Sequence, residues 1–295
     1  MRRAGKRFST WPPREEVRPM RPTITLLTDF GLAGIYVGAM HGVILARCPD
    51  AAIIDLTHQV SPQAIREGAF LLDVAYRYCP PGSIHVAVVD PGVGTTRRAL
   101  ALRVPAAGIF IGPDNGLFTP ILDAHPDTEA RAIAAPAFTR TGPGGAISTT
   151  FHGRDIFAPA AAHLAGGADF ATIGPIIAAE TLIRLPRFWA TWDDATRRRV
   201  SGEIVHIDGF GNLITNIPRA LFAAVAPARL HGALVAGAGH ACRGLVATYG
   251  EAPVGSIVAL FGSGGVLEFA RVGGRADHAG GEPIALGTTV VLHLD

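Results

Sequence analysis

Acidic, glycine-rich turns follow several short apolar segments of the chain. They read TDFG at 28–31, DPGVG at 90–94 and GPDNG at 112–116. In open parallel sheets, ligand sites gather in the crevice at the carboxyl ends of the strands, so we expect several of these turns to face one pocket. Asp29 could accept hydrogen bonds there from a ribose diol, although an aspartate in front of a helix serves equally well as an N-cap.

A carboxylate, a guanidinium and an imidazole stand out as candidates for chemistry. Asp90 and Arg97 lie seven residues apart around a glycine-rich turn that lets the chain fold back. They could form a bidentate pair, and an ordinary loop salt bridge is the alternative. His152 of FHGRD directly precedes an expected helix start, where the backbone can present the imidazole to a pocket while Asp155 caps the helix or pairs with Arg154. A purely structural histidine fits the same pattern.

The other histidines, among them His41, His58, His85 and His163, never occur as HxH, HxxxH or HExxH. We therefore expect no metal ion, because a cage could be assembled only from distant segments. The three cysteines are widely spaced and form no CxxC or Cys/His cluster. This argues against a disulfide framework or structural zinc and favours a reducing, cytoplasmic setting.

Several function classes lose support. No GxGxxG follows Val89, where the chain reads PGVGTT, and neither GxxxxGK[ST] nor GxSxG occurs, which argues against Rossmann redox, kinase-type and ordinary α/β-hydrolase chemistry. The 26 basic and 24 acidic residues leave a net charge of only +2, with several basic residues crowded into 1–22, so nucleic acid is not an expected partner. No run of 18 apolar residues indicates a membrane span.

Strand-like and helix-like segments alternate in the first part of the chain. This alternation predicts an α/β domain at 23–188, with a central, largely parallel sheet between helices. The expected strands are 23–29, 51–56, 83–89, 99–104 and 108–111, and the expected helices are 36–47, 61–78 and 155–165, the last bent at Pro159.

The pattern changes after the charge-dense stretch 186–199. Short strand-like segments with glycine-rich turns follow, with helical spacing only at 218–225, which predicts a linker at 189–199 and a smaller all-β, barrel-like domain at 200–295. The turns DGFGN at 208–212 and GSGG at 262–265 could offer amide, hydroxyl and backbone donors to a polar ligand. Residues 1–22 are basic without an apolar core, and we expect a disordered extension, with Met20 as an alternative start.

Seven motifs occur together in one order, and the chain from Thr23 to Leu294 resembles the S-adenosyl-L-methionine (SAM) hydroxide adenosyltransferase family, hydrolase relatives of fluorinase and chlorinase. The resemblance implies an N-terminal α/β domain, a C-terminal barrel-like domain, and a homotrimer with each active site between subunits. The motifs are LLTDFG with YVGAMHGVI, IIDLTHQVSP, HVAVVDPGVGTTRR, IGPDNG, FHGRDIFAPAAAHLA, IDGFGNLITNI and GSGGVLEFA.

The resemblance also implies a reaction. The family's catalytic residues match Asp90, Arg97 and His152, whereas halogenating relatives have Tyr in place of this Asp and Ser or Gly in place of this His. Water needs a group that accepts or stabilises loss of a proton, and a halide needs a dehydrating, uncharged pocket. Hydrolysis of SAM to adenosine and L-methionine, by attack of water or hydroxide at the ribose 5′ carbon without a cofactor, is therefore the favoured reading. His152 is the candidate base.

The resemblance assigns substrate contacts as well. Asp29 would hold the ribose hydroxyls, Asp208 and Ser263 the amino acid portion, Phe210 and Asn212 the adenine side, and Tyr249 would stack on the base. The chain departs from the family at GRAD, 274–277, and in the glycine pair after Ser263. Three alternatives stay open: a chlorinase-like halogenase, a SAM- or adenosine-binding protein with little turnover, and a metal-dependent hydrolase of another nucleoside or phosphate ester.

Overall fold

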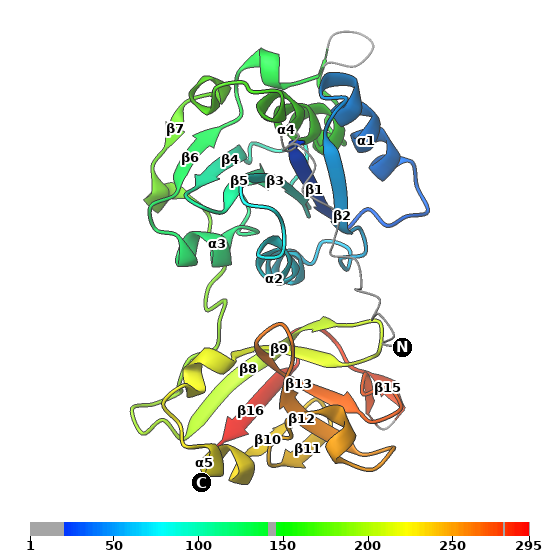
Figure 1. The fold of residues 1–295 in the computed structure, drawn as a ribbon, viewed down its shortest axis with the longest axis vertical. Coiled ribbons are helices and arrows are strands. Elements are labelled where there is room, and N and C mark those ends of the chain that lie inside the picture. The colour runs from blue at the N-terminus through cyan, green and yellow to red at the C-terminus, as the bar shows by residue number, and fades with distance from the viewer. Residues whose placement is uncertain (1–20, 141–145, 280, 295) are drawn as a thin grey trace, which may run out of the picture.

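The computed structural model describes residues 21–140, 146–279 and 281–294. Most of the predicted N-terminal extension therefore lies outside the described residues. The described chain forms an α/β layer structure, at the top of Figure 1, and an all-β structure below it, with helices α2 and α3 on the side of the first sheet that faces the second. Within these residues, no helix is long and apolar enough to cross a membrane.

The first sheet has seven strands in the order β2-β1-β3-β5-β4-β6-β7. Its central strands are buried runs because helices cover both faces: Ile24 and Leu26 pack into the core with α1 and α4, and Leu27 packs into the core with α2 and α3. The strands are β1 (Thr23–Thr28), β2 (Ala52–Thr57), β3 (Ser83–Val88), β4 (Ala99–Val104), β5 (Gly108–Pro113), β6 (Glu129–Ala132) and β7 (Ile176–Ile177), and the helices are α1 (Tyr36–Arg47), α2 (Ile65–Tyr76), α3 (Thr119–Ala124) and α4 (Ala158–Ala165).

This sheet is mixed, with a parallel part and an antiparallel edge. Strands β2, β1, β3 and β5 run parallel, as the alternation of strands and helices predicts. Strand β4 pairs antiparallel with both β5 and β6, and β6 pairs antiparallel with β7. A short connection joins Val104, at the end of β4, to Gly108, at the start of β5. Such a connection can join only antiparallel neighbours, so the two strands expected within 99–111 already implied an antiparallel pair.

The second sheet is all-β and nearly closed, which confirms the barrel-like architecture. Its order is β11-β10-β16-β8-β9-β13-β12, and the end strands β11 and β12 contact each other. The helix expected at 218–225 is a single 3₁₀ turn, Arg219–Phe222. The strands are β8 (Arg199–Ile207), β9 (Leu213–Pro218), β10 (Leu234–Gly237), β11 (His240–Arg243), β12 (Ile257–Phe261), β13 (Val266–Arg271) and β16 (Thr289–His293); β14 (His278–Ala279) pairs with β15 (Glu282–Pro283), and α5 is Pro227–Gly232.

Helix α2 joins the two sheets. On one side it packs into the first core, and on the other Phe70 shares a buried cluster with Val205 and Val266 of the second sheet. A hydrogen bond to a buried carboxylate supports the junction: His206 Nδ1 lies 2.7 Å from Glu67 Oε1. The two layers therefore share a packed, partly charged contact through one helix.

Candidate active site

Two of the predicted turns lie side by side at the carboxyl end of the parallel strands. Strand β1 pairs with β3, with Thr28 opposite Val88, so Asp29 and Asp90 emerge from neighbouring strand ends. A hollow of about 250 Å³ opens there. Its lining residues are Asp29, Phe30, Gln63, Val88, Asp90, Pro91, Val93, Thr150, Phe151, His152 and Gly153.

Arg97 connects the other two predicted catalytic residues. Its Nε lies 2.9 Å from Asp90 Oδ1, and its Nη2 donates to Asp90 Oδ2. The same Nη2 lies 2.7 Å from His152 Nδ1. The side chains of Asp90 and Arg97 are only 4% and 8% exposed, so this is a buried bidentate pair and not a loop salt bridge on the surface. The structure thus brings the predicted carboxylate, guanidinium and imidazole into one hydrogen-bonded group.

The DPGVG turn has little room for larger residues. Val93 N donates to Asp90 O, and Gly94 has a φ of 77°, a left-handed conformation that favours glycine. A Cβ at Gly94 would lie 2.3 Å from Thr149 O, so the turn packs against the backbone just before His152. Arg97 also lies over the ring of Phe157, 5.3 Å from its centroid, which adds a cation–π contact that holds the guanidinium in place.

His152 is held by an irregular helical turn. The helix expected at 155–165 begins earlier, as a π-helical turn over Gly153–Phe157 that runs into α4. Asp155, fully buried, pairs with Arg154, with Nε 2.7 Å from Oδ1, and accepts the Ser148 N–H. Burial raises the pKa of Asp155, but these hydrogen bonds outweigh burial and the net pKa is lowered. The pairing predicted for Asp155 therefore anchors the turn, of a type often found at functional sites.

The imidazole is poised in its neutral form. Burial lowers the pKa of His152, the Arg97 cation lowers it further, and Asp90 and Asp155 oppose the shift only in part. Because a guanidinium can only donate hydrogen bonds, Nδ1 is the acceptor toward Arg97, and the proton of the neutral ring sits on Nε2. The lone pair on His152 Nδ1 therefore points at the Arg97 guanidinium, which is paired with Asp90.

Asp29 does not cap the following helix, whose N-cap is Ile35. Its Oδ2 accepts the Gln63 N–H at 2.8 Å, across the mouth of the hollow. Gln63 has a φ of 64°, so an uncommon backbone conformation presents this N–H. No sequence pattern predicted the role of Gln63.

The predicted residues of the second sheet line a different hollow, of about 670 Å³. Asp208 Oδ1 accepts the backbone N–H groups of Phe210 and Asn212, both at 2.9 Å, and Asn212 Nδ2 donates to Asp208 Oδ2. Phe210 projects into solvent, 79% exposed. Ser263 and Tyr249 lie on the same hollow. Asp208 and Asn212 therefore shape the turn that presents Phe210.

Glu268 is a member of this second hollow that sequence reasoning missed. It is buried, and its Oε1 accepts a hydrogen bond from Tyr249 Oη. Burial raises the pKa of Glu268, and Asp208 raises it further against the opposing hydrogen bond from Tyr249. Burial and Glu268 together raise the pKa of Tyr249. The only sequence signal was an acidic residue inside the apolar run VLEFA.

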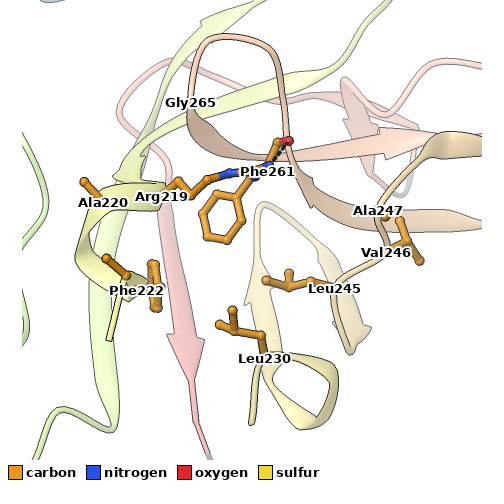
Figure 2. Close-up of a pocket in the computed structure, with 10 residues that line it drawn as sticks. Arg219, Ala220, Phe222, Leu230, Leu245, Val246, Ala247, Phe261 and Gly265 are labelled. Atoms are coloured by element: carbon orange, nitrogen blue, oxygen red, sulfur yellow. Dashed lines mark hydrogen bonds between the residues drawn. The ribbon is translucent and has the colours of Figure 1, made fainter. Parts of the chain in front are cut away.

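Figure 2 shows a third hollow, of about 770 Å³, on the second sheet. Apolar side chains such as Phe222, Leu230 and Leu245 line it. Arg219, the single charged residue among the described residues of its lining, donates to Phe261 O at 2.9 Å and lies over that ring. The cation is therefore already engaged, and the described lining holds no acid–base group, whereas the predicted site residues line the other two hollows.

Comparisons with known proteins agree with this geometry. The model of the SAM hydroxide adenosyltransferase N-terminal domain matches residues 24–174, and that of the C-terminal domain matches residues 202–283. The chain is 42% identical over 266 residues to the (R)-S-adenosyl-L-methionine hydrolase of Thermus thermophilus, covering 88% of this chain and 95% of that protein. It is 39% identical over 267 residues to the enzyme of the same name from Salinispora tropica, covering 86% and 92%.

More distant relatives include halogenating enzymes. A fluorinase of Nocardia brasiliensis is 30% identical over 227 residues, covering 68% of this chain and 72% of that protein. Among solved structures, an uncharacterized conserved protein of Thermotoga maritima is similar with a TM-score of 0.81 and 31% identity, covering 91% of this chain and 99% of that chain. A conserved hypothetical protein of Thermus thermophilus has a TM-score of 0.70 and 38% identity, covering 94% and 100%.

Proposed function

The chain belongs to the SAM hydroxide adenosyltransferase family, and from this premise we propose that it hydrolyses SAM to adenosine and L-methionine. Relatives at 39–42% identity are named as hydrolases of the (R) epimer, so the proposed substrate is SAM with the (R) sulfonium configuration. One observation carries the proposal: Arg97 forms hydrogen bonds to both Asp90 and His152 beside the hollow.

Three residues would handle the water molecule. The Arg97 guanidinium donates to the water oxygen, and His152 Nδ1 takes the water proton once its hydrogen bond from Arg97 is exchanged for one from the water. Asp90 fixes the guanidinium plane and balances its charge. Arg97 itself cannot be the base, because its guanidinium stays protonated. The lowered pKa of His152 keeps the imidazole neutral and ready to accept the proton.

The bond changes balance without a further acid. The hydroxide-like oxygen forms a bond to the ribose 5′ carbon, and the carbon–sulfur bond breaks as its electron pair returns to the sulfonium. Methionine leaves as a neutral thioether, so the leaving group needs no proton. The proton held by His152 passes to solvent when the products leave. Positioning of water in line with the breaking bond is the principal contribution of the protein.

The proposed substrate contacts are those that the family resemblance implies. Asp29 would accept the ribose hydroxyls, since a carboxylate that accepts one N–H from Gln63 retains acceptor capacity. Phe210 and Asn212 would meet the adenine, Asp208 and Ser263 the amino acid portion, and Tyr249 would stack on the base. Glu268, hydrogen-bonded to Tyr249, would fix the orientation of that ring.

The active form would be a homotrimer. The hollow with the catalytic group and the hollow with Phe210 and Asn212 share no lining residue within the described chain. The first holds about 250 Å³, which is small for a whole nucleoside with its amino acid. An exposed Phe210 also suits a surface that a neighbouring subunit covers. Each site would therefore combine the catalytic group of one subunit with the second hollow of its neighbour.

The test is product analysis with separate (R) and (S) epimers of SAM. Purified protein should release adenosine and methionine in equal amounts from the (R) epimer, and His152→Ala should slow release by about 10²–10⁴-fold. His293→Ala, which removes an exposed histidine on β16, is the matched control and should retain full activity. Absence of adenosine despite SAM binding would leave a binding protein as the better reading. Halide-dependent 5′-chloro-5′-deoxyadenosine would instead identify a halogenase.

A further inference from the structure

A second cluster of ligating side chains lies outside the catalytic group. His41 on α1, Asp55 on β2 and His58 directly after β2 bring two imidazoles and a carboxylate together, with one ligating atom of each within 4.8 Å of the others. His41 Nε2 lies 2.9 Å from Asp55 Oδ1, and His58 Nε2 lies 3.0 Å from the same oxygen. The spacing of these residues in the sequence gave no reason to expect the cluster. The fold forms it by placing His41 of α1 beside the end of β2.

The buried histidine has an unused nitrogen. The His58 side chain is 1% exposed, and its Nε2 has no hydrogen-bond partner, because its approach to Asp55 is close but not aligned for a hydrogen bond. A buried nitrogen without a partner is unfavourable. A cation bound between the three side chains would occupy that lone pair.

The surroundings fit a ligated imidazole. His58 Nδ1 lies 2.9 Å from Thr28 Oγ1, which also accepts the Phe30 N–H. In the tautomer with the proton on Nδ1, this bond fixes the ring and leaves the Nε2 lone pair directed at the cluster, as outer partners do in metal sites. His41 and Asp55 are 31% and 40% exposed, so they can adjust and leave room for water ligands.

We propose that His41, Asp55 and His58 form a binding site for Zn²⁺ or a similar divalent transition ion. Two imidazoles with one carboxylate suit zinc, whereas magnesium and calcium prefer oxygen ligands. Bond lengths of about 2.0–2.1 Å place tetrahedral zinc ligands roughly 3.3 Å apart, so the two histidine–aspartate separations of 2.9 and 3.0 Å need to open by only a few tenths of an ångström, and the two imidazole nitrogens, within 4.8 Å of each other, need to settle at a similar distance.

The site has a structural consequence near the proposed active site. His58 O accepts the Gly31 N–H at 2.7 Å, and Val60 N donates to Thr28 O. A cation on His58 would therefore stabilise the segment that carries Asp29. The cation touches none of the three proposed catalytic residues, and the proposal does not depend on SAM hydrolysis.

The experiment is a zinc titration of untagged, chelator-treated full-length protein by calorimetry, with Co²⁺ absorption as a second readout of coordination. We expect one equivalent of Zn²⁺ per chain, unaffected by millimolar Mg²⁺. His41→Ala and Asp55→Asn each remove one partly exposed ligand and should weaken binding at least about tenfold, while the exposed histidine control His293→Ala should not. Absence of zinc binding by the wild-type chain, or undiminished affinity in either ligand variant, would overturn the site.

Discussion

Subunits that are defective in different halves of the proposed active site should rescue one another. His152→Ala removes the proposed base from the first hollow, and Phe210→Ala removes an aromatic ring from the second. Phe210 is 79% exposed within one chain, so its loss should leave the fold intact. Stacking of a base on an aromatic ring contributes about 1–3 kcal/mol, so Phe210→Ala should lower kcat/KM by roughly 5- to 150-fold. His152→Ala should lower it by about 10²–10⁴-fold.

Co-expression of the two variants would give mixed trimers if the proposed homotrimer forms. If each site takes its first hollow from one subunit and its second from the next, every mixed trimer has one fully wild-type site out of three. Activity of the selected mixed assemblies should then rise to about a third of the wild-type value, well above the mean of the separate variants. Adenosine release at subsaturating SAM measures this, with purification through two different tags to select mixed assemblies. Mixed trimers no more active than that mean would refute sites shared between subunits.

Three further predictions concern charge. Because burial and Arg97 lower the pKa of His152, the acid limb of the kcat/KM profile should have its midpoint below 6.5, the value for an ordinary histidine, and a midpoint above 6.5 would contradict a neutral base. Asp90→Asn leaves Arg97 as a buried unpaired cation, so urea unfolding should show a loss of about 3–5 kcal/mol together with loss of hydrolysis. His85, buried on the strand that leads to Asp90, has its pKa lowered by burial to about 4, so the folded state binds this proton more weakly than the unfolded state. The free energy of unfolding should therefore fall by about 1.4 kcal/mol per pH unit as pH drops from about 6.5 to about 4, and His85→Phe should lack this component.

The sequence predicted the parts of the site that local chain geometry controls. A glycine-rich turn folds the chain back on itself, so the spacing of Asp90 and Arg97 suggested a bidentate pair with a loop salt bridge as the alternative, and the structure contains the buried bidentate pair. The parallel strand ends likewise placed Asp29 beside Asp90. His152 is different, because its contact with Arg97 spans 55 residues and depends on how α4 packs against the sheet. Only the family resemblance associated it with the other two.

Long-range packing explains what the sequence could not show. Glu268 on β13 contacts Tyr249, which lies in a 3₁₀ turn just before β12, and β12 pairs with β13 in the nearly closed sheet. The hydrogen bond between Glu67 and His206 exists because α2 packs against β8. An isolated charged residue in an apolar segment signals that a partner must exist, since a buried charge needs one. The partner's identity depends on the fold.

The charges around the first hollow also favour water over halide as the nucleophile. Asp90 neutralises Arg97, and His152 is neutral, so the catalytic group presents no net positive charge to attract an anion. Asp29 adds a carboxylate on the same hollow, which would repel chloride or fluoride. In the proposed mechanism water is uncharged when it enters, and it becomes an anion only as its proton moves to His152 beside the Arg97 cation. The Asp90–Arg97 pair would therefore weaken halide binding and yet stabilise hydroxide as it forms. This difference accounts for hydrolysis on a fold that is shared with halogenating relatives.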